Sequence, residues 1–143
     1  MPRLIVESDA EGAAPFAFKA DSGDLLALLS FGYAEPFGSQ HPLTVFVRRL
    51  KTSHGIDVTP LVTFYDHDVS DAQDAANLEA AWQDPAPLAI AARAAAGLVR
   101  TDPAAAELQA DYPALNTLLL ELAEMSDRAA AQTARIRLSF RMD

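Results

Sequence analysis

The chain of 143 residues contains no cysteine, which excludes disulfide bonds, thiolate nucleophiles and thiolate metal ligands. It also has no apolar run long enough to cross a bilayer. The longest run, residues 86–99, is interrupted by Arg93, and a membrane-spanning helix needs about 20 apolar residues. Residues 1–7 are too short and too soon charged to act as a secretory signal. We therefore expect a cytoplasmic protein in a reducing compartment, with no membrane partner.

The common catalytic and nucleotide-binding signatures are missing as well. The sequence has no G-x-x-x-x-G-K-S/T loop, no G-x-G-x-x-G turn after a strand, no G-x-S-x-G elbow and no H-E-x-x-H pair. These absences exclude only the common forms of such sites. We predict no catalytic residue and no cofactor, and an enzyme is the less favoured interpretation.

Positive charge is scarce, because 11 Lys and Arg stand against 20 Asp and Glu, giving a formal net charge of −9. A field of that sign disfavours binding to nucleic acid and to anionic membranes. It is compatible with a basic protein partner, although a high net charge also serves solubility alone. Arginine outnumbers lysine and alanine is abundant, which is typical of a bacterial protein encoded by a GC-rich genome.

Apolar residues, in contrast, are plentiful. The chain is 50% hydrophobic and 22% charged, the proportions of an ordinary globular protein. A chain of this length typically forms one domain, and it buries roughly 70% of the surface that its unfolded form exposes. We predict that residues 1–143 form a single globular domain.

Five of the nine prolines precede apolar runs, where helices would begin: Pro42, Pro60, Pro85, Pro103 and Pro113. Proline suits the first helical position because its missing amide would be unpaired there and its φ is already helical. Thr59, Asp84 and Asp102 stand just before three of these prolines, and their side-chain oxygens can accept from the free amides of a first turn. This pattern divides the middle of the chain into short helices.

Apolar residues spaced three and four apart support these helices, as Leu43, Phe46, Val47 and Leu50 do after Pro42. The pattern predicts helices over residues 22–33, 42–50, 61–69, 85–100 and 113–129, and a short turn over residues 103–109. For residues 42–50 a strand is the alternative, because Val45 and Val47 are β-branched. Ser70 and Gln73 match a capping box that would begin one further helix. For the segment that follows Pro60, a strand over residues 58–65 is the alternative.

The two ends of the chain carry strand patterns. Ile136, Leu138, Phe140 and Met142 alternate with polar residues, and a period of two indicates a strand with one face on the core. Residues 3–7 and 16–19 have the pattern of a β-hairpin, which a third strand and a helical cover would stabilise. We predict an α+β fold in which a small antiparallel sheet, made of the N-terminal hairpin plus the C-terminal strand, is covered by about five or six short helices.

One polar group has the residue types of a metal site, namely Asp66, His67 and Asp68, with His54 upstream. Imidazole and carboxylate are the ligands that zinc, iron or manganese take when thiolate is absent. The alternative is an acidic, solvated junction where aspartates accept from free backbone amides. The spacing matches no established metal motif.

Residues 31–38 form an aromatic, glycine-containing loop. Phe31, Tyr33 and Phe37, with His41 beyond them, could line a small-molecule pocket or form a partner-binding loop, since functional residues concentrate on loops. The alternative is that the rings fold back over the core. The imidazole of His41 could act as a general base, but its place before Pro42 also suits a helix cap.

A basic row lies on the last strand, made of Arg135, Arg137 and Arg141. Such a row could hold phosphate or a carboxylate-rich partner. The alternative is a solvated sheet face whose arginines discourage edge-to-edge aggregation.

Two functional hypotheses follow. The leading one is a non-catalytic protein-interaction module, such as an accessory protein, an inhibitor or an assembly factor. Its partner would be a protein, of basic character if the net charge matters, or a second copy bound through the last strand or the alanine-rich helix. The alternative is a small ligand-binding protein or metal-dependent enzyme that uses the loop with His41, or His54 with residues 66–68.

Overall fold

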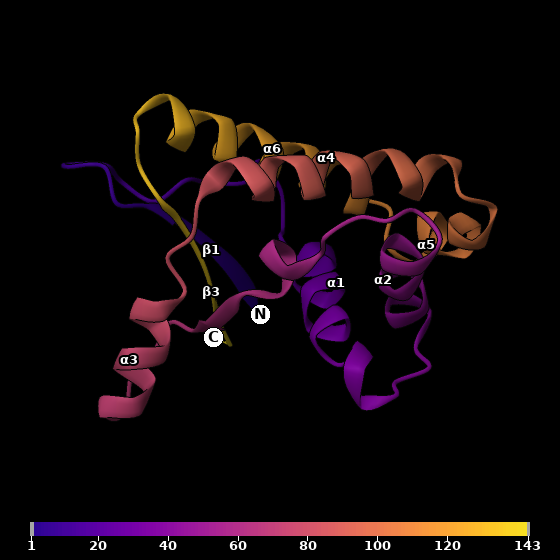
Figure 1. The fold of residues 1–143 in the computed structure, drawn as a ribbon, viewed down its shortest axis with the longest axis horizontal. Coiled ribbons are helices and arrows are strands. Elements are labelled where there is room, and N and C mark those ends of the chain that lie inside the picture. The colour runs from indigo at the N-terminus through magenta and orange to yellow at the C-terminus, as the bar shows by residue number, and fades with distance from the viewer. Residues whose placement is uncertain (1, 143) are drawn as a thin grey trace.

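The computed structural model describes residues 2–142 and has an α+β fold, as the sequence predicts (Figure 1). Its helices are α1 (Gly23–Tyr33), α2 (Pro42–Thr52), α3 (Ala72–Ala80), α4 (Pro85–Thr101), α5 (Ala106–Asp111) and α6 (Leu115–Ala131). Its strands are β1 (Arg3–Ser8), β2 (Phe64–Asp66) and β3 (Ile136–Arg141), and short 3-10 turns cover Glu35–Phe37, Thr59–Val62 and Pro103–Ala105. Within residues 2–142, no helix combines the length and the apolar character that a bilayer span requires.

The prolines mark helix starts to different degrees. Pro42 and Pro85 each occupy the first turn of an α-helix. The side chains before them cap those turns, because His41 accepts from the amide of Leu43 and Asp84 from the amide of Ala86. Pro60 and Pro103 begin only 3-10 turns, and α6 starts two residues after Pro113.

The predicted capping box at the start of α3 is wrong. Asp71 is the N-cap and accepts from the amide of Asp74 at 2.8 Å. Ser70 instead donates its hydroxyl to the Asp74 carboxylate at 2.7 Å. An ionised carboxylate is the stronger acceptor, so Asp71 caps the helix and Ser70 holds the chain that leads into it.

The sheet is mixed and not purely antiparallel, with the order β1-β3-β2. β1 and β3 pair antiparallel, and Arg3 lies opposite Arg141, so the two ends of the chain meet (Figure 1). β2 pairs parallel to β3, with Phe64 opposite Leu138 and Asp66 opposite Phe140. The predicted helix over residues 61–69 is therefore wrong, and the alternative strand lies closer to the structure.

The predicted N-terminal hairpin is wrong, because residues 16–19 pair with β1 only through a single bridge between Val6 and Phe16. The amide of Phe16 donates to the carbonyl of Val6 at 2.9 Å. Beyond it, the amide of Lys19 donates to the Glu121 carboxylate on α6 at 3.0 Å. Residues 16–19 thus turn towards the helices, because their backbone finds a partner there, and they form no second strand.

The core lies between the sheet and the helices. α4 and α6 lie side by side across the top of Figure 1, with α1, α2 and the sheet below them, and α3 projects away at the lower left. Five alanines of α4 are buried, namely Ala89, Ala91, Ala92, Ala95 and Ala96. Small side chains at a helix contact reduce the distance between the axes, so α6 can pack closely on α4. Ile136 and Leu138 of β3 complete the same core.

Candidate functional site

The predicted aromatic loop over residues 31–38 is largely helical, because Phe31 and Tyr33 belong to α1 and Phe37 to the 3-10 turn Glu35–Phe37. The rings of Phe31 and His41 are stacked, with centroids 3.7 Å apart and planes 8° apart. His41 Nδ1 accepts from the amide of Leu43 at 3.1 Å, and Nε2 lies 3.5 Å from the hydroxyl of Tyr112. With both ring nitrogens facing protein groups, His41 acts as a helix cap in this structure.

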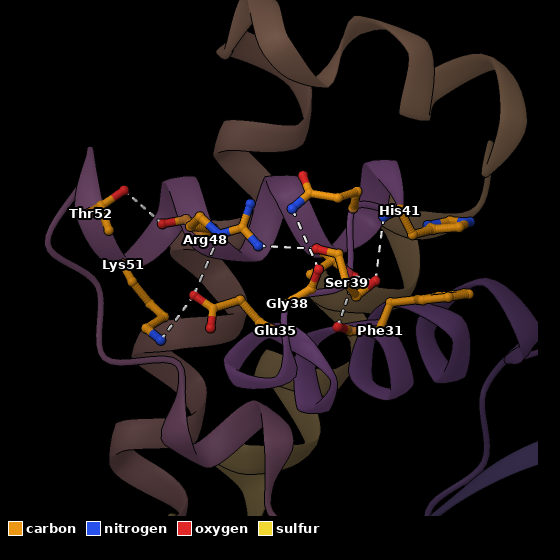
Figure 2. Close-up of polar contacts among 10 residues, drawn as sticks. Phe31, Glu35, Gly38, Ser39, His41, Arg48, Lys51 and Thr52 are labelled. Atoms are coloured by element: carbon orange, nitrogen blue, oxygen red, sulfur yellow. Dashed lines mark hydrogen bonds and ion pairs between the residues drawn. The ribbon is translucent and has the colours of Figure 1, made fainter.

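The rest of the loop is tied to α2, as Figure 2 shows. Arg48 donates to the carbonyl of Ser39 at 3.0 Å. Glu35 lies 3.2 Å from the ammonium of Lys51 and 3.9 Å from Nε of Arg48. Thr44 donates to the carbonyl of Phe31 at 3.0 Å. These contacts fix the backbone of the loop on the protein.

Tyr33, at the end of α1, and Phe37, in the 3-10 turn, face outward with exposed fractions of 58% and 78%. Their rings contact each other at a centroid distance of 6.0 Å, and Tyr33 contacts Phe64 at 6.4 Å. Phe64 in turn contacts Phe140 of β3 at 5.9 Å. The four rings form a continuous row, called the aromatic row below, that leads from the loop to the sheet.

Beside the aromatic row lies an apolar hollow of about 650 Å³. One wall is a face of α1, with lining residues Gly23, Leu26, Ala27, Ser30 and Tyr33. The opposite side is formed by Pro2, Phe64, Tyr65, Asp66, Phe140 and Met142. At 1.5 Å per helical residue, the α1 wall extends for about 15 Å. We call this hollow the α1 groove.

The rim of the α1 groove leaves apolar side chains in water. Besides Tyr33, Tyr65 is 39% exposed and Met142 is 64% exposed. Asp66 carries the only formal charge among the lining residues at neutral pH. The groove is thus apolar, open and bordered by a carboxylate.

The segment that follows β2 is strongly acidic. Residues 66–80 contain five carboxylates and no Lys or Arg, the acids being Asp66, Asp68, Asp71, Asp74 and Glu79. Hydrogen bonds from the Ser70 hydroxyl and amide lower the pKa of Asp74 below its usual value. Asp66 is the member of this acidic segment that lines the α1 groove.

The predicted metal ligands are divided among separate contacts. His54 Nε2 lies 3.0 Å from Asp102, whereas His67 Nδ1 lies 3.0 Å from the hydroxyl of Ser139. Asp66 accepts from the amide of Asp68 in a local turn. Across residues 2–142, no three such side chains lie close enough together to hold a metal ion. The metal site stays a prediction that the geometry does not support.

Ser139, His67 and Glu7 have the residue types of a catalytic triad but not its geometry. Ser139 Oγ and Glu7 Oε1 both approach the same nitrogen of His67, Nδ1, at 3.0 and 3.8 Å. In a triad the two partners bind different ring nitrogens, so that one orients the base and the other gives up its proton. Ser139 is also fully buried. The cluster provides no nucleophile that a substrate could reach.

The predicted basic row is paired within the chain. Arg135 binds Asp9 at 2.8 Å, Arg137 binds Glu7 at 3.1 Å and Arg141 binds Asp68 at 3.1 Å. Trp82 lies under two of these guanidinium groups, with Arg137 4.4 Å and Arg135 5.7 Å from its ring centroid. These contacts favour the alternative interpretation, in which the row stabilises the sheet face.

Asp102 joins two helices through a buried carboxylate. Its oxygens accept two hydrogen bonds from Arg49 on α2, each at 3.0 Å, and one from the amide of Ala104 at 2.9 Å. The hydrogen bonds from Arg49, then those from His54 and Ala104, hold the pKa of Asp102 well below its usual value. The cluster connects the end of α2 to the end of α4 and has no nucleophile of its own.

Sequence reasoning named Tyr33 and Phe37 but missed most of the α1 groove. Its walls come from residues 23–33, 64–66 and 140–142, which are distant in sequence. The alternation at the C-terminus predicts Met142 on the core face of the last strand, whereas β3 ends at Arg141 and Met142 is 64% exposed, so the sequence provided no signal for this side of the groove.

None of the protein-family models, curated proteins or solved structures with which the chain was compared matches it.

Proposed function

We propose that this protein is a non-catalytic interaction module of the bacterial cytoplasm, and that it binds an apolar segment of a basic protein partner in the α1 groove. The observation that carries this proposal is the open, apolar hollow of about 650 Å³ with Tyr33, Tyr65 and Met142 exposed at its rim. Contiguous exposed apolar surface on a globular protein marks an interaction site more often than isolated apolar residues do.

The residue types at the rim are those that dominate binding energy. Aromatic side chains and methionine are enriched at protein interfaces, and tyrosine is among the residues most often found as a hot spot. Tyr33 ends α1 and Phe37 lies in the 3-10 turn that follows, and the flanking carbonyls of Phe31 and Ser39 accept hydrogen bonds from α2. A fixed binding surface loses little conformational entropy when a partner binds, so the loop favours association.

Charge selects the partner. The net charge is −9, and Asp66 borders the α1 groove at the start of the acidic segment. Complementary charges accelerate encounter and disfavour partners of the same sign. A basic protein with an apolar segment therefore fits, whereas an acidic protein or a nucleic acid does not.

A second candidate function is the binding of a small apolar molecule. The volume of the α1 groove falls within the range of about 300–1,000 Å³ that ligand pockets occupy. Such a ligand would occupy the α1 groove, as the protein segment would. Measuring both protein binding and small-molecule binding by variants of the groove therefore distinguishes the two functions.

The test compares affinity capture by the wild-type protein with capture by Tyr33→Ser and Met142→Ser. The matched control is Ile90→Ser, because Ile90 is 69% exposed on α4 and does not line the groove. A captured protein is identified by mass spectrometry, purified and titrated by calorimetry, and light scattering measures self-association of the free chain.

We expect the groove variants to weaken binding of the purified partner at least tenfold, as for hot-spot residues, and the Ile90 variant to bind as the wild type does. Equal binding by all three variants would contradict the proposal. Capture of no protein, together with a melting temperature that rises with apolar ligands in the wild type alone, would favour the second candidate.

A further inference from the structure

The two edges of the sheet differ in how their backbone groups are used. On β1, the amide of Leu4 donates to Ser22 Oγ at 2.9 Å, and the carbonyl of Val6 accepts from Phe16 at 2.9 Å. Residues 16–22 thus cover that edge. Proteins commonly cover edge strands because unpaired backbone groups are templates for another strand.

β2 forms the other edge, and its backbone directions follow from its pairing. The amide of His67 donates to the carbonyl of Phe140 at 2.9 Å. In a parallel pair the amide and carbonyl of one residue point to the same side, and consecutive residues alternate. Tyr65 and His67 therefore face β3, whereas the amides and carbonyls of Phe64 and Asp66 point away from it. In the part of the chain that the structure describes, those four groups have no hydrogen-bond partner.

The α1 groove lies beside this edge, since all three residues of β2 line it. Side chains alternate between the two faces of a strand, and Phe64 lies on the face that packs on Phe140 and Tyr33. A strand added next to β2 would place every second side chain on that same face, towards the α1 wall. The remaining side chains would lie on the face of Tyr65.

We propose that the partner segment binds as a fourth strand along the free edge of β2, with alternating apolar and basic residues. This inference rests on the proposed function and specifies the partner. Its apolar side chains enter the α1 groove on the side of Phe64. Its basic residues are favoured by the net charge of −9 and by the acidic side chains that follow β2, of which Asp71, Asp74 and Glu79 lie beyond the Asp68 that Arg141 already binds.

The probe is a fluorescein-labelled nine-residue peptide in which lysine alternates with valine and phenylalanine, measured by anisotropy. We make two isomers, one N-methylated at the apolar residues and one at the lysines. N-methylation removes a backbone donor and leaves the side chains unchanged. In an added strand alternate amides face β2, so we expect one isomer to lose at least tenfold in affinity and the other to bind nearly as the parent does.

Amide hydrogen exchange gives a second readout. We expect saturating peptide to slow exchange at Phe64 and Asp66 at least tenfold, because these amides gain partners. We expect little change at Tyr65 and His67, whose amides already face β3. A peptide of the same composition with apolar residues at helical spacing, and a peptide with glutamate in place of lysine, should each bind at least tenfold more weakly.

The outcomes separate the two proposals. If Tyr33→Ser abolishes binding but the two N-methylated isomers bind alike, the groove is used and strand addition is wrong. If the two N-methylated isomers differ in affinity while Tyr33→Ser and Met142→Ser bind the peptide normally, the peptide pairs with β2 but does not use the α1 groove. That outcome would contradict the proposed function. The inference is overturned if the peptide with apolar residues at helical spacing binds more tightly than the alternating peptide. It is also overturned if the alternating peptide does not bind at millimolar concentration.

Discussion

The helical half of the molecule and the free end of its sheet use apolar residues in opposite ways. Where α4 packs on α6, large side chains such as Leu88, Leu118 and Leu119 are fully buried. At the α1 groove, Tyr33, Tyr65 and Met142 remain in water. The protein therefore has a well-packed apolar core, and the exposed side chains at the groove are additional to that core. An apolar surface that remains open in a well-packed protein is available for a partner.

The largest effect is expected in the helical half. Leu119→Ala should lower the free energy of unfolding by about 2–5 kcal/mol, because it removes buried methyl groups and leaves a cavity. Urea denaturation followed by circular dichroism measures this loss. A cost below about 1 kcal/mol would show that α6 is not tightly packed, and the contrast between the two regions would fail.

Asp102→Asn tests the polar contact that joins two helices of this half. Because hydrogen bonds hold the folded pKa of Asp102 below its usual value of 3.8, the unfolded chain binds more protons than the folded chain just below that pH. The contribution of the carboxylate is therefore fully present above about pH 4 and declines as pH falls further towards the lowered folded pKa.

We expect the variant to be less stable than the wild type at neutral pH and the difference to shrink progressively below pH 4. Denaturation curves at pH 7, 5, 4 and 3 provide the measurement. A difference that stays constant over this series would show that the charge of Asp102 contributes nothing to stability.

Gly32 and Gly97 differ in the space that surrounds them, because Gly32 lies on a packed helix face and Gly97 on an open one. A Cβ at Gly32 of α1 would lie 3.1 Å from Val47 Cγ2 and 3.2 Å from Val62 Cγ1, whereas a Cβ at Gly97 of α4 would meet nothing within 4 Å. Gly97→Ala should stabilise the protein by about 0.5–1 kcal/mol through helix propensity. Gly32→Ala should be the less stable variant by about 1–2 kcal/mol, because overpacking opposes the same gain. Equal melting temperatures of the two variants would contradict the close approach at Gly32.

The smallest effect on stability is expected at the aromatic row. Phe37→Ser should change the free energy of unfolding by no more than about 0.5 kcal/mol, because the ring is largely in water and surface substitutions seldom cost more. Denaturation under the conditions used for Leu119→Ala gives the comparison. A larger loss would mean that the ring supports the fold, and the interpretation of the row as a free binding surface would weaken.

Local patterns predicted the helices well and the sheet partly. Pro85 with Asp84, and the apolar spacing after Pro42, place α4 and α2 almost as the structure has them. The alternation at the C-terminus predicts β3 correctly. The parallel pairing of β2 with β3 was not predicted, because Phe64–Asp66 is only three residues long and its partner lies more than 70 residues away.

The candidate site was predictable only in part for the same reason. Tyr33 and Phe37 stood out by residue type, but so did Phe31 of α1 and His41, the N-cap of α2, whose stacked rings have a structural role. Nothing in the spacing distinguishes the exposed rings from the stacked ones. The contacts of α2 with the loop make that distinction.

By itself the sequence determined where α2 and α4 begin, which face of β3 is apolar and how negative the protein is, since these properties depend on neighbouring residues and on composition. The tertiary structure decided that β2 joins the sheet in parallel, that residues 16–19 leave it, and that α1 and two strands enclose an open apolar groove. Contacts between distant segments are set by how whole elements pack, and local propensities carry no information about that packing.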